Sequence, residues 1–153
     1  MDNEFFTDYL ERLENLRDAF RQQIHDLPTE ALDWVPGPEM NSIGVLLAHT
    51  AGSLRWWIGD VAVGEPSGRD REREFAAKGS TAEQLLGKVD AVVEYVRGVL
   101  PRLREMDLAE DCTPPDRKQR ATRGWALLHA MEHGYNHLGH IELTAQLWRQ
   151  RRK

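Results

Sequence analysis

The sequence lacks the features that define several classes of protein. Its 153 residues include a single cysteine, Cys112, so no internal disulfide can form. No stretch approaches the ~20 apolar residues that a membrane helix needs, and the start, with Asp2, Asn3 and Glu4, is not a basic and apolar leader. The net charge of −5 argues against a nucleic-acid-binding face. These absences predict a cytoplasmic protein that binds neither membranes nor nucleic acids.

Two isolated features have simple structural explanations. Cys112 lies in a proline-containing segment far in sequence from every histidine, which favours an incidental thiol over a nucleophile. Cations near the end of a helix are stabilised by the negative end of its dipole. That effect accounts for the one dense basic run, which consists of Arg149, Arg151, Arg152 and Lys153.

The composition is that of one ordinary globular domain. Apolar residues make up 41% of the chain and charged residues 29%, which excludes a disordered or membrane-embedded chain. A length of 153 residues suits a single core. We therefore expect one domain over residues 1–153.

Apolar residues recur at three- and four-residue steps in four segments, a spacing that predicts amphipathic helices. Asn41 or Ser42 is expected to cap the second helix and Ser80 or Thr81 the third, while Pro101 is expected to kink the third. The predicted helices cover approximately residues 5–25, 42–63, 81–103 and 122–149.

No strand is indicated, so the sequence predicts an all-α four-helix bundle. The charged segment 69–78 is expected to be a solvated crossover between the second and third helices, which leaves the up-and-down order open. The last helix is expected to contribute apolar side chains from Trp125, Leu128, Ile141, Leu143 and Leu147.

The last predicted helix carries a stripe of histidines. His129, His133, His137 and His140 follow one another at steps of four, four and three residues, so they share one side of a helix. Two imidazoles one turn apart can reach the same metal ion. The alternatives are a chance run on an exposed face, or a buried histidine with an ordinary hydrogen bond.

His49 strengthens the metal hypothesis. It lies in a mostly apolar stretch of the second helix, so its ring is expected to point into the core and to need a partner there, either an ion or an ordinary hydrogen bond. Three imidazoles would form a centre with an open fourth position, which suits catalysis. Asp60 or Glu142 is a candidate for orienting the ligands.

Four other catalytic signatures are missing from the sequence. It contains no His-Glu-x-x-His motif and no pair of Glu-x-x-His motifs for a di-iron bundle. It also has no glycine-rich phosphate loop and no Gly-x-Ser-x-Gly elbow. A mononuclear, nitrogen-rich site is the metal architecture that remains.

Two segments resemble the DinB-like (DinB/YfiT) superfamily. Residues 34–49, WVPGPEMNSIGVLLAH, are similar to the approach to that superfamily's first metal ligand. Residues 132–141, EHGYNHLGHI, are similar to its His-x-x-x-His segment and the Gly-Gln-Ile or Gly-His-Ile tail that follows. The resemblance spans nearly the whole chain, and the two motifs at this separation are more specific than either alone.

The resemblance implies a four-helix bundle of up-down-down-up connection, often a homodimer, with a histidine triad that binds zinc, nickel or a similar divalent ion. His49, His133 and His137 fall on the triad positions. His140 stands where many members carry glutamine and His129 is an addition, so these two are expected at the rim of the site. Characterised relatives include metal-dependent transferases and isomerases that use low-molecular-weight thiols such as bacillithiol or mycothiol.

Three functions fit these observations. The first is a metal-dependent thiol transferase or hydrolase that acts on a small electrophilic molecule. The second is a non-catalytic stress-response or ligand-binding bundle stabilised by its ion, and the third is a helical interaction domain without metal.

Five tryptophans are expected to form core or dimer contacts more readily than a substrate box, given the area that each buries. They are Trp34, Trp56, Trp57, Trp125 and Trp148.

Overall fold

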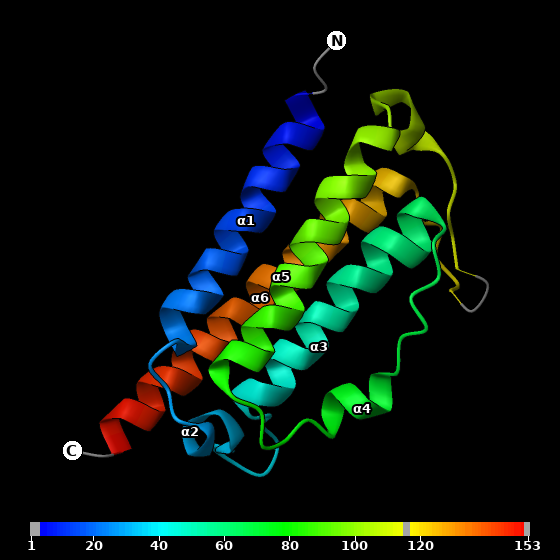
Figure 1. Cartoon of the computed structure of the whole chain (residues 1–153). Coiled ribbons are helices and arrows are strands. Elements are labelled where there is room, and N and C mark those ends of the chain that lie inside the picture. Colours follow the sequence, from blue (N-terminus) through cyan, green and yellow to red (C-terminus); the bar gives the residue numbers. More distant parts are fainter. Residues whose placement is uncertain (1–3, 115–116, 152–153) are drawn as a thin grey trace.

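A computed structural model describes residues 4–114 and 117–151 (Figure 1). Four long helical units dominate this part of the chain, and the prediction of an all-α four-helix bundle is confirmed. The elements are α1 (Glu4–Ile24), α2 (Thr29–Asp33), α3 (Ile43–Arg55), η1 (Trp56–Val63), α4 (Arg71–Phe75), α5 (Ala82–Val99), η2 (Leu100–Arg102), η3 (Glu105–Ala109) and α6 (Arg123–Arg151). The expectations for Asp2, Asn3, Arg152 and Lys153 fall outside the described residues.

The helices follow the up-down-down-up order. In Figure 1, α1 and α6 run in one direction along the bundle, whereas α3 and α5 run in the other. Each helix packs against two of the others, so that α1 contacts α5 and α6, and α3 contacts the same two. Because α3 and α5 are parallel, the segment between them must return along the length of the bundle, and α4 lies in this return segment.

Local signals explain where the helices begin. The Ser42 hydroxyl accepts a hydrogen bond from the amide of Val45 and caps α3. Thr81 and Gln84 form a reciprocal capping box at the start of α5. These contacts assign the caps to Ser42 and Thr81 rather than to the neighbouring alternatives, Asn41 and Ser80.

Two helices differ from the sequence prediction near their carboxyl ends. The second predicted helix reaches Val63 as expected, but its last two turns, η1, are π-helical, and Gly64 with a φ of 86° terminates it. The third helix does not continue through a kink at Pro101. Its α-helical part stops at Val99 and the chain tightens into η2, because proline cannot provide the amide that an α-helix needs.

The core is continuous along the bundle, and its largest fully buried side chains include Leu13, Leu16 and Phe20 of α1. Along α6, Ile141 is fully buried as expected, whereas Leu128 and Leu143 are 61% and 51% exposed. The expectation for these two leucines was wrong. Small residues allow α6 to approach its neighbours closely, so the buried face of α6 is defined by residues such as Ala126, Ala130 and Gly134.

Gly134 marks a close approach between α6 and α1. A Cβ atom at this position would lie 2.6 Å from Cδ2 of the fully buried Leu16. We expect Gly134→Ala to lower the free energy of unfolding by about 1 kcal/mol, because overpacking outweighs the gain in helix propensity. The matched variant Gly139→Ala, whose Cβ would meet nothing within 4 Å, should instead gain about 0.5–1 kcal/mol. Urea unfolding measures both, and a stabilising Gly134→Ala would contradict the packing argument.

No helix among the described residues is both long enough and apolar enough to cross a membrane.

Candidate metal centre

Three histidines from two helices converge inside the bundle. His49 comes from the middle of α3, and His133 and His137 lie one turn apart on α6. Nε2 of His133 lies 3.3 Å from Nε2 of His49 and 3.2 Å from Nε2 of His137. Each of the three histidines offers a ring nitrogen within 4.8 Å of those of the other two. The structure therefore brings together the three residues to which the sequence assigned the metal.

The separations suit a divalent ion better than hydrogen bonds alone. A nitrogen ligand lies about 2.0–2.1 Å from zinc, so two ligands of a tetrahedral site are about 3.3 Å apart. The observed Nε2 separations of 3.2 and 3.3 Å match this value. A single proton on His133 cannot make two linear hydrogen bonds, whereas one cation can accept three lone pairs. The donor set, three imidazoles with no thiolate, is typical of zinc and nickel.

Glu74 sets the orientation of His49. Its Oε2 lies 3.0 Å from Nδ1 of His49, and the Glu74 side chain is almost fully buried. Because a carboxylate can only accept a hydrogen bond, Nδ1 of His49 carries the proton and Nε2 keeps its lone pair for the ion. This is the carboxylate–histidine arrangement found behind many metal sites.

Arg69 in turn holds Glu74. Its Nε and Nη2 donate to the two carboxylate oxygens at 2.6 and 2.8 Å, a bidentate pair that is largely shielded from solvent. Burial alone would raise the pKa of the Glu74 carboxyl, but the hydrogen bonds from Arg69 and His49 outweigh burial and hold this pKa below its ordinary value. Glu74 is therefore ionised at neutral pH and can accept the proton of His49.

The pair of Glu74 and Arg69 was not anticipated. Segment 69–78 was expected to be a solvated crossover, yet it places α4 against α3 and buries Glu74. Gly52, one turn after His49, makes the approach feasible, since a Cβ atom there would overlap the Glu74 carboxylate. The apolar Phe75 within a charged run was the available signal, and its ring centroid lies 4.9 Å from that of His49.

The other proposed carboxylates do not orient the histidines. Asp60 accepts hydrogen bonds from Arg55 and from the amide and hydroxyl of Ser67. No hydrogen bond joins Glu142 to a histidine in the described part of the chain. The expectation that Asp60 or Glu142 serves this role was therefore wrong, and Glu74 has it instead.

His140 and His129 occupy different parts of the rim. Nδ1 of the exposed His140 lies 3.3 Å from Nδ1 of His137 and can steady that ring. His129 stacks on Trp125 with 4.7 Å between ring centroids, and its centroid is 6.1 Å from that of His133. Neither belongs to the group of three histidines whose nitrogens converge.

The five tryptophans form two separate groups. Trp34 packs on Trp148, with ring centroids 5.7 Å apart. Trp56, Trp57 and Trp125 gather next to His129 instead, where Trp57 lies edge-on to both Trp125 and His129. The first pair is a packing contact, whereas the second group forms an aromatic flank beside the histidine stripe.

Burial keeps the two α6 histidines neutral. Burial is the largest cause that lowers the pKa of His133 and of His137 to about 4, and the neighbouring histidines lower it further. Burial also lowers the pKa of His49, although Glu74 opposes this effect. At neutral pH all three rings therefore present lone pairs, which is the state that binds a metal ion.

These pKa values predict how stability depends on pH in the metal-free protein. An unfolded histidine has its ordinary pKa of 6.5, so below that pH the unfolded chain binds more protons than the native state, in which the pKa of His133 is about 4. The free energy of unfolding should therefore fall as the pH is lowered from 6.5 toward 4.5. Urea unfolding across this window measures the slope, which His133→Gln should reduce. A wild-type slope of zero or of opposite sign would contradict the burial of these rings.

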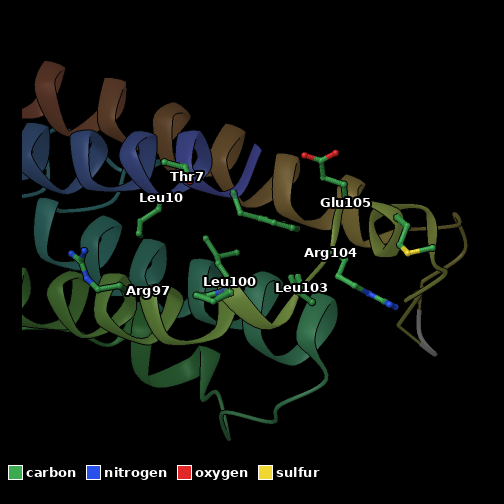
Figure 2. Close-up of a pocket in the computed structure, with 10 residues that line it drawn as sticks. Thr7, Leu10, Arg97, Leu100, Leu103, Arg104 and Glu105 are labelled. Carbon is green, nitrogen blue, oxygen red and sulfur yellow. The ribbon is translucent and has the colours of Figure 1, made fainter. Parts of the chain in front are cut away.

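An apolar pocket elsewhere in the bundle is not part of this centre. It has a volume of about 760 Å³ and lies between α1, the end of α5 and η3, with Leu10, Leu100 and Leu103 among its lining residues (Figure 2). None of the clustered histidines lines it. This pocket is therefore separate from the histidines of α3 and α6.

A four-helix bundle with a partly buried three-histidine cluster defines the class of this protein. The family model for the DinB superfamily matches residues 12–141, so the chain belongs to that superfamily. No curated protein sequence matches it significantly.

Solved structures with the same fold have low sequence identity to this chain. A conserved protein from Enterococcus faecalis has a TM-score of 0.77 at 17% identity and covers 92% of this chain and 95% of its own. A DinB-like protein (YjoA) from Bacillus subtilis has a TM-score of 0.70 at 16% identity, and the match covers 92% of this chain and 91% of YjoA. YfiT from Bacillus subtilis is described as a probable metal-dependent hydrolase with an unusual four-helix bundle topology. It has a TM-score of 0.76 at 16% identity, and the match covers 97% of this chain and 90% of YfiT.

Proposed function

We propose that this protein is a metal-dependent enzyme that activates a nucleophile, either water or a low-molecular-weight thiol, for attack on a small electrophilic molecule. One observation carries the proposal, namely the convergence of ring nitrogens from His49, His133 and His137. The description of YfiT as a metal-dependent hydrolase supports it at the level of the shared fold.

His49, His133 and His137 would hold the ion, for which zinc or nickel is the best match to the donor set. When bound, such an ion lowers the pKa of a coordinated water or thiol and so supplies a nucleophile near neutral pH. Because only these three histidines converge among the described residues, a bound ion would have room for that nucleophile, as in catalytic rather than structural sites.

The remaining residues prepare the site. Glu74 accepts the Nδ1 proton of His49 and fixes its tautomer, while Arg69 holds Glu74 in place. Phe75 lies against the His49 ring and limits the access of water to that side. These contacts set the geometry of the site before any substrate arrives, which reduces the reorganisation that the reaction requires.

The convergence of α3 and α6 on one point also favours a second function. An ion bound there would link α3 to α6 through His49 and His133, which are 84 residues apart in the sequence. Such a link would stabilise the fold without any catalysis, as expected for a non-catalytic metal-binding or ligand-binding bundle.

Turnover measurements separate the two functions. Tag-free protein loaded with zinc or nickel is incubated with bacillithiol, mycothiol or glutathione and a panel of small electrophiles, and hydrolysis is followed in parallel without thiol. The enzyme hypothesis expects metal-dependent turnover that is lost in His137→Ala and kept in His25→Ala, because the exposed His25 is not in the cluster. If metal stabilises the protein but no substrate is turned over, the non-catalytic function is supported instead.

A further inference from the structure

A second pocket lies behind the carboxylate that orients His49. This α4 pocket is formed by α4 with its flanking segments, by α3 and by α5, and has a volume of about 710 Å³. Four small residues are part of its lining, and their short side chains leave space between the helices. These are Ala48, Ala51, Gly52 and Ala91. A volume of this size is in the range of small-molecule sites.

The charge of the α4 pocket is opposite to that of the whole molecule. The chain has a net charge of −5, yet five cations and only two carboxylates, Asp70 and Glu74, line the pocket. The cations are Arg55, Arg69, Arg73, Lys78 and Lys88. Like charges gathered around a hollow focus the electrostatic potential there and attract ligands of the opposite sign.

Some of these charges are already compensated within the protein. Glu74 is neutralised by Arg69, and Arg55 pairs with Asp60. By contrast, no ion pair joins Arg73, Lys78 or Lys88 to another described residue. Asp70 accepts a hydrogen bond from the amide of Arg73, which caps α4. Arg73 in α4, Lys78 in the segment after it and Lys88 in α5 therefore line one hollow. The two carboxylates among the lining residues are already engaged, Asp70 as the cap of α4 and Glu74 in the pair with Arg69.

We propose that the α4 pocket binds a small oxyanion with two or more negative charges, either a phosphate-bearing molecule or a di- or tricarboxylate. Arg73, Lys78 and Lys88 supply the charge, and the small residues in the lining leave room for the body of the ligand. Arginine and lysine both bind such oxyanions through charge-assisted hydrogen bonds.

The α4 pocket is distinct from the metal centre. None of the three clustered histidines lines it. The two sites share the Arg69–Glu74 pair. Oε2 of Glu74 contacts His49, and the same carboxylate also borders the α4 pocket beside Gly52. The inference therefore goes beyond the proposed function and stands whether or not the histidines support catalysis.

Binding is tested with the full chain in its metal-free form, because the probes chelate metal ions. ¹⁵N-labelled protein is titrated with pyrophosphate in one arm and citrate in the other, and each is compared with sodium chloride at equal ionic strength. We expect saturable shifts of the amide signals of Gly52, Ala77 and Ser80 in at least one arm. The arm with the lower Kd identifies the ligand as a phosphate or as a carboxylate.

Charge variants show whether the response belongs to the pocket. Arg73→Gln/Lys88→Gln should raise the Kd by about tenfold or more, since each charge-assisted contact is worth at least that factor. Arg12→Gln/Lys118→Gln removes the same charge from exposed positions outside the pocket and should leave the Kd within about twofold. Well-dispersed spectra show that each variant is folded.

Three results would overturn the proposal. The first is the absence of saturable shifts in both arms, and the second is saturable shifts confined to the histidine cluster. The third is an equal loss of affinity in the two double variants, which would reflect net charge alone. None of these results bears on turnover at the metal centre, so the two proposals can fail separately.

Discussion

Replacing His133 with alanine should abolish stoichiometric metal binding. Nε2 of His133 lies 3.3 Å from Nε2 of His49 and 3.2 Å from Nε2 of His137. Removing this ring therefore leaves only two of the three proposed ligands. We expect the zinc affinity to fall by more than about a hundredfold, beyond the range seen when only a residue behind a ligand is changed. Competition with a chromophoric chelator measures the affinity, and elemental analysis of tag-free protein measures the metal content.

The matched control for this change is His129→Ala. It removes the same side chain from the same helix one turn earlier, where the ring stacks on Trp125 instead of joining the cluster. This variant should keep the zinc affinity within about threefold, since it alters neither a ligand nor a group bonded to one. Equal losses in the two variants, or full affinity in folded His133→Ala, would remove the basis for the three-histidine site.

The fold could be predicted from the sequence because its signals are local. Apolar spacing defined the four helices, and side chains such as Ser42 and Thr81 marked where two of them begin. The parallel arrangement of α3 and α5 was not determined by these signals. It came from the family resemblance, because helix direction depends on contacts between segments that are distant in the sequence.

Part of the candidate site could also be predicted from local signals in the sequence. Helical spacing placed His133 and His137 together, and the apolar surroundings of His49 indicated a ring in the core. Glu74 was missed because a charged residue in a charged run is most often solvated, and only tertiary structure shows that Arg69 compensates its burial. The expectation for Leu128 and Leu143 was wrong for a different reason, since the buried face of α6 is occupied by small residues and by other large apolar side chains. These large side chains are Leu127, Leu138, Ile141 and Trp148.

Replacing Glu74 with glutamine should weaken metal binding without removing a ligand. The amide has nearly the same shape as the carboxylate, but it cannot accept from Arg69 with both terminal atoms and from His49 as well. We expect the zinc affinity to fall by about 10- to 100-fold. The free energy of unfolding of the metal-free protein should fall by roughly 1–3 kcal/mol, because buried groups lose their charged partner.

A spectroscopic signature distinguishes positioning of His49 from a general loss of stability. In the wild type the Glu74 carboxylate holds the proton of His49 on Nδ1, so the ¹⁵N shifts of this ring should report one tautomer. Glu74→Gln should give a mixture of tautomers, whereas Glu72→Gln on the same helix removes an exposed carboxylate and should change neither the tautomer nor the affinity. A folded Glu74→Gln protein with wild-type affinity and an unchanged tautomer would show that His49 is oriented by the packing of α3 alone.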